Sequence, residues 1–222
     1  MKADFWHQCW ENDHIAFHQD DYHPLMMQLW CSWAGDTQGA VFVPLCGKSS
    51  DMNWIAKHHK VIGSELSDIA CRDFYVDNNI SYQLNPLSLL SPDAEGLTHY
   101  QSEHIDLYQG DFFALSPQDV DNCSLIYDRA ALIALPPALR AQYAAHLQLL
   151  FAQGGKLLLF TVEYPKDEIK GPPFCVSEEE VNTLFAGCEI TRVVAQPMAD
   201  NQFARRTLKV SWLLEVAYFI DL

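Results

Sequence analysis

A turn that contains a single glycine, and an acid that follows it, are the residues of this sequence most suited to binding a ligand. Gly47 lies in the turn 43–49 (VPLCGKS), which follows a short apolar run, and Glu65 ends the next such run. Ligands bind beyond the carboxyl ends of parallel strands, so both residues are expected at one edge of a sheet. An acid in this place can accept hydrogen bonds from both hydroxyls of a ribose. Taken alone, Glu65 is equally well explained as a solvated surface carboxylate.

The same turn lacks the glycines of phosphate-binding loops. Gly47-Lys48-Ser49 resembles the end of a phosphate loop, but that motif requires a glycine where the chain has Phe42. The dinucleotide fingerprint GxGxxG is also absent, because this turn holds one glycine. Such a turn brings backbone close to a ligand without cradling a pyrophosphate. A nucleoside cofactor without phosphates is therefore expected, and an acidic site favours S-adenosylmethionine, whose sulfonium is a cation.

The composition excludes several classes of protein. The chain has 222 residues, of which 29 are acidic and 14 are Lys or Arg, so its formal net charge is −15. Binding to nucleic acid or to an anionic membrane surface requires basic residues, so neither partner is expected. A hydrophobic content of 49% rules out a disordered acidic tail. The polar start of the chain does not resemble a secretory signal, and no apolar run approaches the roughly 20 residues of a membrane span.

The cysteines indicate a reducing compartment. There are seven, an odd number, and no two of them form a C-x-x-C pair. In a chain long enough to have its own core, this favours reduced thiols in the cytoplasm. Each cysteine is therefore expected to be a small buried apolar residue.

Short β-branched runs alternate with helical patterns, which is typical of a parallel sheet covered by helices. The expected strands of this type are 41–43, 60–65, 104–111, 124–128 and 156–164. The tail holds two further strand candidates, 189–196 and 209–220, with no helix between them, so they are expected to pair antiparallel. The pattern predicts a mostly parallel sheet that finishes with an antiparallel strand, in a single domain over residues 1–222.

Three segments lie outside this alternation. Residues 79–103 are expected to be irregular, with turns at Asn85-Pro86 and Ser91-Pro92 and one extra strand. This segment and the loop 165–175 are expected to shape an acceptor pocket. Residues 1–35 precede the first strand, and we expect them to form a lid over the cofactor.

Motifs spread over nearly the whole chain resemble those of the thiopurine S-methyltransferases, and of the bacterial branch in particular. They are Phe17-His18-Gln19, the turn 43–49, Asp51-Met52-x-Trp54, 61–67 (VIGSELS), 127–132 (YDRAAL) and 171–174 (GPPF). The resemblance implies the α/β fold of the class I S-adenosylmethionine-dependent methyltransferases. That fold has helices on both faces of a seven-stranded, mostly parallel sheet whose last strand is antiparallel. S-adenosylmethionine is the implied cofactor.

The resemblance also assigns residues to the cofactor. Trp10 matches the tryptophan that covers it, and Leu45 matches the turn residue whose backbone meets its methionine end. Glu65 matches the acid that binds the ribose. The pair Asp111-Phe112 matches the positions that flank the adenine, and Arg129 matches the arginine that contacts the carboxylate region.

Two residues are assigned to the acceptor in the same way. Phe17 matches an aromatic residue beside the substrate, and Arg206, next to Arg205, matches a basic residue at the substrate mouth. No catalytic base is assigned, because an aromatic thiol is largely ionised near neutral pH. The histidines His14, His18 and His23 do not form the HExxH arrangement, so no metal site is expected.

The implied activity is in-line methyl transfer to the sulfur of small aromatic or heterocyclic thiols, thiopurines included. The bacterial relatives also imply a wider role in selenium or tellurium detoxification. The expected partner is a small-molecule thiol, and the protein is expected to be a monomer. Two alternatives are left open. One is an O- or N-methyltransferase of another small molecule, and the other is an S-adenosylmethionine-binding module without catalysis.

Overall fold

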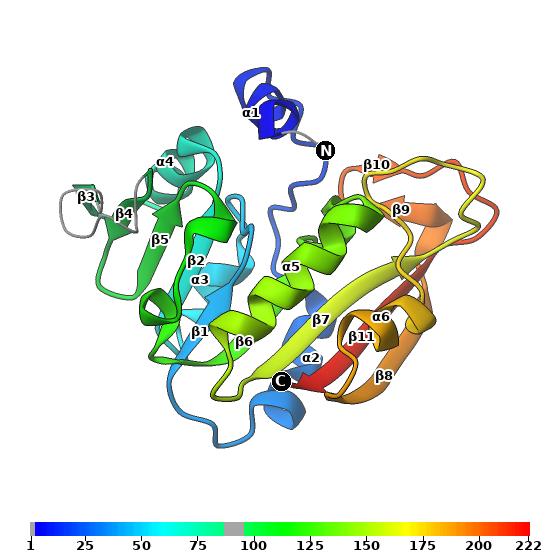
Figure 1. Ribbon diagram of the computed structural model, residues 1–222. Coiled ribbons are helices and arrows are strands. Elements are labelled where there is room, and N and C mark those ends of the chain that lie inside the picture. Colours follow the sequence, from blue (N-terminus) through cyan, green and yellow to red (C-terminus); the bar gives the residue numbers. More distant parts are fainter. Residues whose placement is uncertain (1–2, 87–95) are drawn as a thin grey trace.

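The strands of the computed structural model form one large sheet and one small one. The structure describes residues 3–86 and 96–222. Over these residues the large sheet has the strand order β3-β4-β5-β2-β1-β6-β7-β11-β8 (Figure 1). Its strands are β1 (Ala40–Val43), β2 (Val61–Glu65), β3 (Gln83–Pro86), β4 (Thr98–Gln101), β5 (Ile105–Gln109), β6 (Cys123–Arg129), β7 (Lys156–Glu163), β8 (Glu189–Pro197) and β11 (Leu214–Asp221). The small sheet pairs β9 (Gln202–Phe203) with β10 (Arg206–Thr207).

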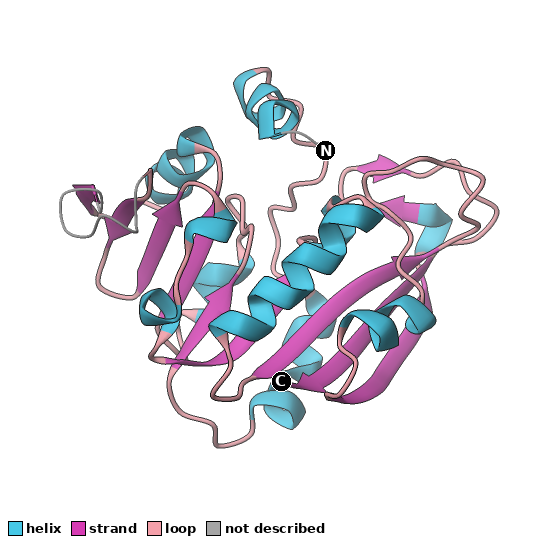
Figure 2. Ribbon diagram, in the orientation of Figure 1, coloured by secondary structure: helices cyan, strands magenta, loops and turns pink. Residues whose placement is uncertain are grey.

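Helices cover both faces of the large sheet (Figure 2). They are α1 (Ala3–Glu11), α2 (Pro24–Ala34), α3 (Asp51–Ile55), α4 (Asp68–Asp77), α5 (Pro137–Leu150) and α6 (Glu178–Leu184). Alternate side chains of β1 enter two separate cores: Phe42 packs in the core of α5 and α6, and Val41 and Val43 pack in the core of α2, α3 and α4. Both faces of the central strands are thus apolar, as expected for parallel strands between two helical layers.

Seven of the strands have the predicted arrangement. The neighbours β5, β2, β1, β6 and β7 run parallel. The last strand, β11, lies between β7 and β8 and pairs antiparallel with both. It begins at Leu214 rather than at residue 209.

The prediction for residues 79–103 is partly wrong. Two strands, β3 and β4, form an antiparallel pair that extends the sheet beyond β5, so the sheet has nine strands instead of seven. Asn85 and Pro86 belong to β3 and do not form a turn. The expected turn at Ser91-Pro92 lies outside the described residues. The pair is held by Tyr100 of β4, whose ring is buried and stacks on Tyr75 of α4 at a centroid distance of 5.9 Å.

The order of the strands determines where a ligand is expected. β1 has β2 on one side and β6 on the other, so the chain reverses its direction of winding between β1 and β6. In doubly wound sheets, a crevice opens beyond the carboxyl ends of the strands at this point. Helix α1 lies above the same edge of the sheet (Figure 1). The structure therefore places the N-terminal segment over the expected binding position.

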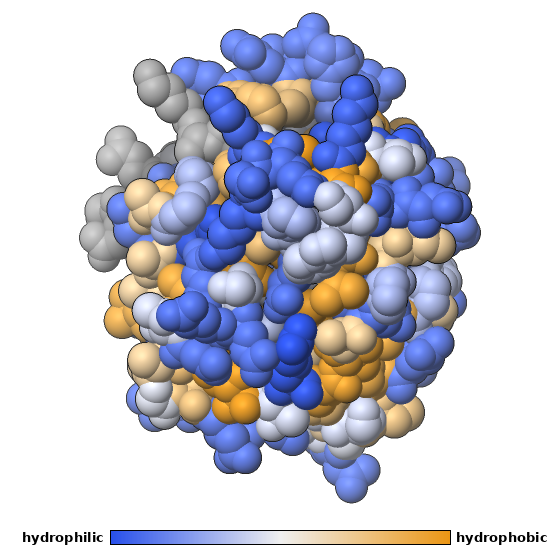
Figure 3. Space-filling view, turned by 90° about the vertical axis from the view of Figure 1, so that its right-hand side faces the viewer, coloured by the Kyte–Doolittle hydropathy of each residue, from blue (hydrophilic) through white to orange (hydrophobic). Residues whose placement is uncertain are grey.

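The side of the molecule beside β8 is mostly polar, with smaller hydrophobic areas between the polar side chains (Figure 3). β8 is an edge strand, and its Arg192 forms ion pairs with Glu163 at 3.3 Å and Glu178 at 3.0 Å. Charged side chains on an edge strand disfavour pairing with a second chain. In the described part of the chain, the helices are too short or too polar to span a bilayer.

All seven cysteines are free thiols, but they are not all buried. Cys46, Cys71, Cys123 and Cys175 are buried as expected, whereas Cys9 and Cys188 are half-buried and Cys31 is exposed. Cys31 follows Trp30 on α2, so when Trp30 enters the core, Cys31 turns outward. Burial raises the pKa of the Cys46 and Cys123 thiols, which disfavours their reactive thiolate forms.

This difference predicts one fast-reacting cysteine. With an aromatic disulfide reagent at pH 8, Cys31 should react first in the native protein, and the four buried thiols should react only after unfolding. The absorbance of the released thiolate measures the reaction. Cys31→Ser should remove the fast phase and leave the slow phases unchanged. A fast phase that persists in this variant would mean that a cysteine other than Cys31 is accessible in the native protein.

Candidate active site

A cavity of about 820 Å³ lies beyond the carboxyl ends of the central strands. A volume of this size is typical of small-molecule sites. Every residue assigned from the sequence lines it: Trp10, Phe17, Leu45, Glu65, Asp111, Phe112, Arg129 and Arg206. These residues come from segments far apart in the chain, and the fold brings all of them to one cavity.

Glu65 supports the turn after β1. The backbone N–H of Gly47 donates to Glu65 Oε2 at 2.9 Å, and the N–H of Ser67 donates to Oε1 at 2.7 Å. Glu65 is 6% exposed, and burial raises the pKa of its carboxyl, while the two N–H donors act in the opposite direction. A carboxylate offers about four lone-pair positions, so each oxygen can accept one further hydrogen bond.

The turn brings its backbone close to the cavity because two of its residues adopt positive φ angles. Leu45 has φ +46° and Gly47 has φ +55°. A Cβ atom at Gly47 would lie 3.3 Å from the Trp10 ring, which is tight. The single glycine therefore allows α1 to pack directly on the turn.

Aromatic side chains of the N-terminal segment form one wall of the cavity. Phe17 contacts the rings of Trp6 and Trp10 edge-to-face, with centroid distances of 5.6 and 5.7 Å. Trp10 is 7% exposed and packs with Ile15 and Ala70. Trp10 therefore lies between the turn after β1 and Phe17, where Gly47 approaches its ring.

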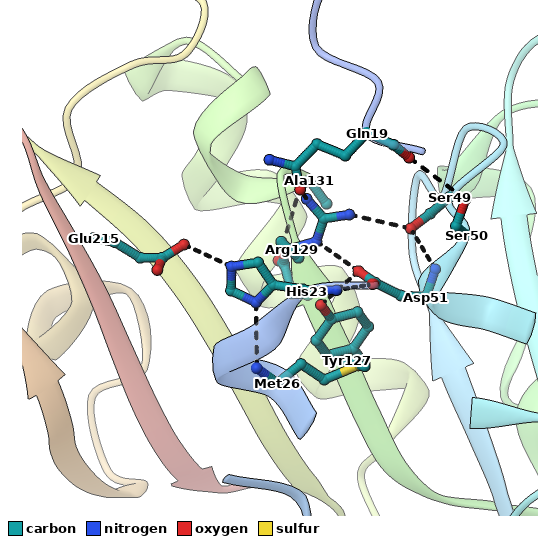
Figure 4. A network of polar contacts seen from close by, with 11 residues as sticks. Gln19, His23, Met26, Ser49, Ser50, Asp51, Tyr127, Arg129, Ala131 and Glu215 are labelled. Atoms are coloured by element: carbon teal, nitrogen blue, oxygen red, sulfur yellow. Dashed lines mark hydrogen bonds and ion pairs between the residues drawn. The ribbon is translucent and has the colours of Figure 1, made fainter. Parts of the chain in front are cut away.

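Arg129 extends from the end of β6 into a buried polar network (Figure 4). Its Nε donates to Asp51 Oδ2 at 2.6 Å, and one terminal nitrogen donates to Gln19 Oε1 at 2.7 Å. The Tyr127 hydroxyl also donates to Asp51 Oδ2, at 2.8 Å, and the backbone N–H of His23 donates to Oδ1 at 2.8 Å. Asp51 thus holds the guanidinium at the cavity with a carboxylate that is itself fully buried.

The network continues from Asp51 through His23 to Glu215 of β11, further along the sheet (Figure 4). Nδ1 of His23 accepts a hydrogen bond from the backbone N–H of Met26 and so caps α2. Nε2 of the same ring lies 2.8 Å from Glu215 Oε1 on β11. One nitrogen that accepts and one that faces a carboxylate define a neutral ring with its proton on Nε2. His23 is therefore a structural residue that joins α2, α3 and β11.

Sequence reasoning did not assign this network. Asp51 was part of the motif shared with the family, but no site role was given to it. Gln19 and Tyr127 also belong to motifs shared with the family but were given no site role, and His23 was considered only as a metal ligand and rejected. One available signal was the acid at the start of α3, since Asp51 opens a short helix whose other buried residues, Met52 and Ile55, are apolar.

Phe112 is more deeply packed than its assigned role suggests. It is 3% exposed and contacts the rings of Tyr143 and His146 at centroid distances of 5.0 Å. Asp111 accepts a hydrogen bond from the backbone N–H of Phe113 at 3.0 Å and thereby fixes the short helical turn that follows. The more exposed Phe113 also lines the cavity.

The two neighbouring arginines of the C-terminal region have different environments. Arg206 lines the cavity and donates to the carbonyl of Pro172, while its buried Nε has no hydrogen-bond partner in the described residues. Burial lowers the pKa of Arg206. Arg205 instead forms an ion pair with Asp20. A buried donor without a partner is costly, so the Arg206 side chain is suited to an acceptor group on a ligand.

Comparisons with known proteins assign the chain to a family. A model of the family described as thiopurine S-methyltransferase matches residues 1–221. The chain belongs to the thiopurine S-methyltransferase family. A relative of that name from Shewanella oneidensis is 42% identical over 225 residues, covering 99% of each chain. Another from Photobacterium profundum is 40% identical over 227 residues, covering 98% of this chain and 100% of its own.

Solved structures agree with the fold. A SAM-dependent methyltransferase from Anabaena variabilis has a TM-score of 0.65 at 13% identity and covers 97% of this chain and 93% of its own. The N-methyltransferase NodS from Bradyrhizobium japonicum, solved with S-adenosylhomocysteine, has a TM-score of 0.60 at 14% identity, with 96% and 97% covered. The α/β fold of class I methyltransferases is thus confirmed. This family member is an S-adenosylmethionine-dependent methyltransferase.

Proposed function

We propose that this thiopurine S-methyltransferase family member transfers a methyl group to the sulfur of small aromatic or heterocyclic thiols, thiopurines included. The observation that carries the proposal is the set of residues that line the cavity beyond the carboxyl ends of the central strands. It combines a nucleoside-type end, formed by the turn after β1 and Glu65, with a wall of Phe17, Pro172 and Arg206. Flat apolar acceptors with one hydrogen-bond acceptor or negative charge fit such a wall.

We assign the cofactor to the end of the cavity nearest the turn. Glu65 would accept hydrogen bonds from the ribose hydroxyls, and the backbone of Leu45 would meet the methionine end. The guanidinium of Arg129, held by Asp51, has two N–H donors without a partner among residues 3–86 and 96–222, and these suit a carboxylate. Asp111-Phe112 lies where the adenine would be flanked, and Trp10 closes the site from above.

The bound cofactor supplies a methyl group on a positively charged sulfur. Transfer to a thiolate is an in-line displacement that neutralises charge, so the protein gains most from alignment and from exclusion of water. The aromatic rings of Trp10 and Phe17 contribute an apolar wall whose faces attract a sulfonium. The sheet and its turns keep these groups in place while the acceptor enters.

The remaining expectations form part of the same proposal. Residues 1–35 would act as a lid, because α1 covers the turn and Gln19 binds Arg129. We expect a monomer in the cytoplasm, consistent with the charged edge strand β8 and with free cysteines. Selenols and tellurols are further acceptors, since their chemistry parallels that of thiols.

Incubation with labelled S-adenosylmethionine and a panel of thiols, phenols and amines tests the proposal. Transfer to thiols is the expected result. Transfer to phenols or amines but never to thiols would instead assign the protein to O- or N-methylation. Cofactor binding without transfer to any acceptor would indicate a binding module.

A further inference from the structure

His18 lines the cavity, and the proposed function gives it no role. It lies between Phe17, on the aromatic wall, and Gln19, which binds Arg129. Its side chain is 11% exposed. Within residues 3–86 and 96–222, the one polar contact of the ring is between Nε2 and Asp20 Oδ1 at 3.6 Å, which is too long for a hydrogen bond. The imidazole is thus nearly buried but forms no hydrogen bond with the described residues.

The carboxylate of Asp20, whose side chain is 73% exposed, lies beside this ring and pairs with Arg205. One terminal nitrogen of Arg205 donates to both oxygens of Asp20, at 2.5 and 2.6 Å. The backbone N–H of Arg205 also donates to the carbonyl of Ala16 at 3.0 Å, so the connection between β9 and β10 is tied to the N-terminal segment. Imidazole, carboxylate and guanidinium therefore follow one another outward from the cavity. At 3.6 Å from Nε2, the carboxylate of Asp20 is close enough to stabilise a positive charge on the ring.

The charges around His18 favour its neutral form. Burial lowers its pKa most, and Lys48, Arg205 and Arg129 lower it further, while Asp20 acts in the opposite direction. The cations come from the turn after β1, the β9–β10 connection and the end of β6. The carboxylate of Asp20 is an acceptor only, so a neutral ring that turns a protonated Nε2 toward it would leave Nδ1 to accept a proton.

We propose that His18 accepts the thiol proton of those acceptors that are not ionised at the pH of the reaction. The inference rests on the proposed S-methylation. The proton leaves the acceptor S–H for Nδ1 of His18, and the freed electron pair of the acceptor sulfur forms the bond to the methyl carbon. The electrons of the broken carbon–sulfonium bond remain on the departing thioether. The imidazolium, stabilised by Asp20, then returns its proton to water.

This role makes the effect of His18 depend on the acceptor. An aromatic thiol with an electron-withdrawing group is already a thiolate at pH 7 and needs no base. An alkyl-type thiol, with a pKa near that of cysteine at about 8.5, is mostly protonated. A structural role for His18 would instead affect both acceptors equally.

The test compares 4-nitrothiophenol with phenylmethanethiol at pH 7. His18→Gln should lower kcat/KM for phenylmethanethiol by about 100-fold or more, and for 4-nitrothiophenol by no more than about threefold. Activity on 4-nitrothiophenol also reports that the variant is folded. His104→Gln, which changes a histidine with a 67% exposed side chain, is the matched control and should change neither value.

A measurement without turnover accompanies the kinetics. The ring signal that disappears from the NMR spectrum in His18→Gln identifies His18. In the unaltered protein, this signal should titrate with a pKa below the usual histidine value, and Asp20→Asn should lower that pKa further. Equal losses on both acceptors, or no loss on phenylmethanethiol, would overturn the role of His18. Failure of the unaltered protein to methylate even 4-nitrothiophenol would overturn the proposed S-methylation, and with it this inference.

Discussion

Glu65→Gln is expected to weaken binding of S-adenosylhomocysteine by about 1.5–3 kcal/mol, or roughly 10- to 150-fold. Two effects combine. The amide loses the charge that strengthens hydrogen bonds from ribose hydroxyls. In the unaltered protein, the N–H groups of Gly47 and Ser67 both donate to oxygens of Glu65. The variant Glu65→Gln would place an NH2 group against one of these two N–H groups. The turn that approaches the cofactor should therefore lose one of its supports.

Isothermal calorimetry measures this loss, and thermal unfolding in parallel shows whether the variant is folded. Glu163→Gln is the matched control, because Glu163 is also the last residue of a strand of the sheet but pairs with Arg192 outside the cavity. It should leave the affinity unchanged. An unchanged affinity in Glu65→Gln would remove Glu65 from the cofactor site.

The residues that the sequence could place are those whose role follows from local position. Gly47 and Glu65 are assigned because each follows an apolar strand, and parallel strands bring their carboxyl ends to one edge. The alternation of Val41, Phe42 and Val43 between two cores explains why this strand is apolar throughout and could be identified as buried. For such residues, the local sequence pattern predicts the position that the fold gives them.

The residues that the sequence could not place depend on contacts between distant segments. Asp51 accepts from the N–H of His23, 28 residues away, and from Arg129, 78 residues away. The His23–Glu215 contact joins positions 192 apart. Nothing in the local sequence distinguishes these polar residues from solvated ones. Likewise, the β3–β4 pair depends on the packing of Tyr100 against α4, which no local pattern of turns predicts.

Removal of the Asp51 side chain is expected to have the largest effect on stability. Asp51→Ala leaves the guanidinium of Arg129, the Tyr127 hydroxyl and the His23 N–H without their shared acceptor. Loss of one partner of a buried ion pair typically costs about 3–5 kcal/mol. Urea unfolding at pH 7 measures the change. The matched control is Asp77→Asn, because Asp77 is 55% exposed in its ion pair with Lys48 and an exposed pair contributes about 0–1 kcal/mol.

The charge of Asp51 also gives this effect a pH dependence. Burial alone would raise the pKa of Asp51, but Arg129, the His23 N–H and the Tyr127 hydroxyl outweigh it, so the pKa lies below its usual value. A carboxyl with a depressed pKa stabilises the fold above its unfolded pKa, about 3.9, and loses that contribution as the pH falls toward the folded value. Between pH 5 and pH 3, the free energy of unfolding should therefore fall less steeply in Asp51→Asn than in the unaltered protein. Equal slopes would mean that the pKa of Asp51 is the same in the folded and unfolded states, which would contradict the stabilisation of its charge by Arg129.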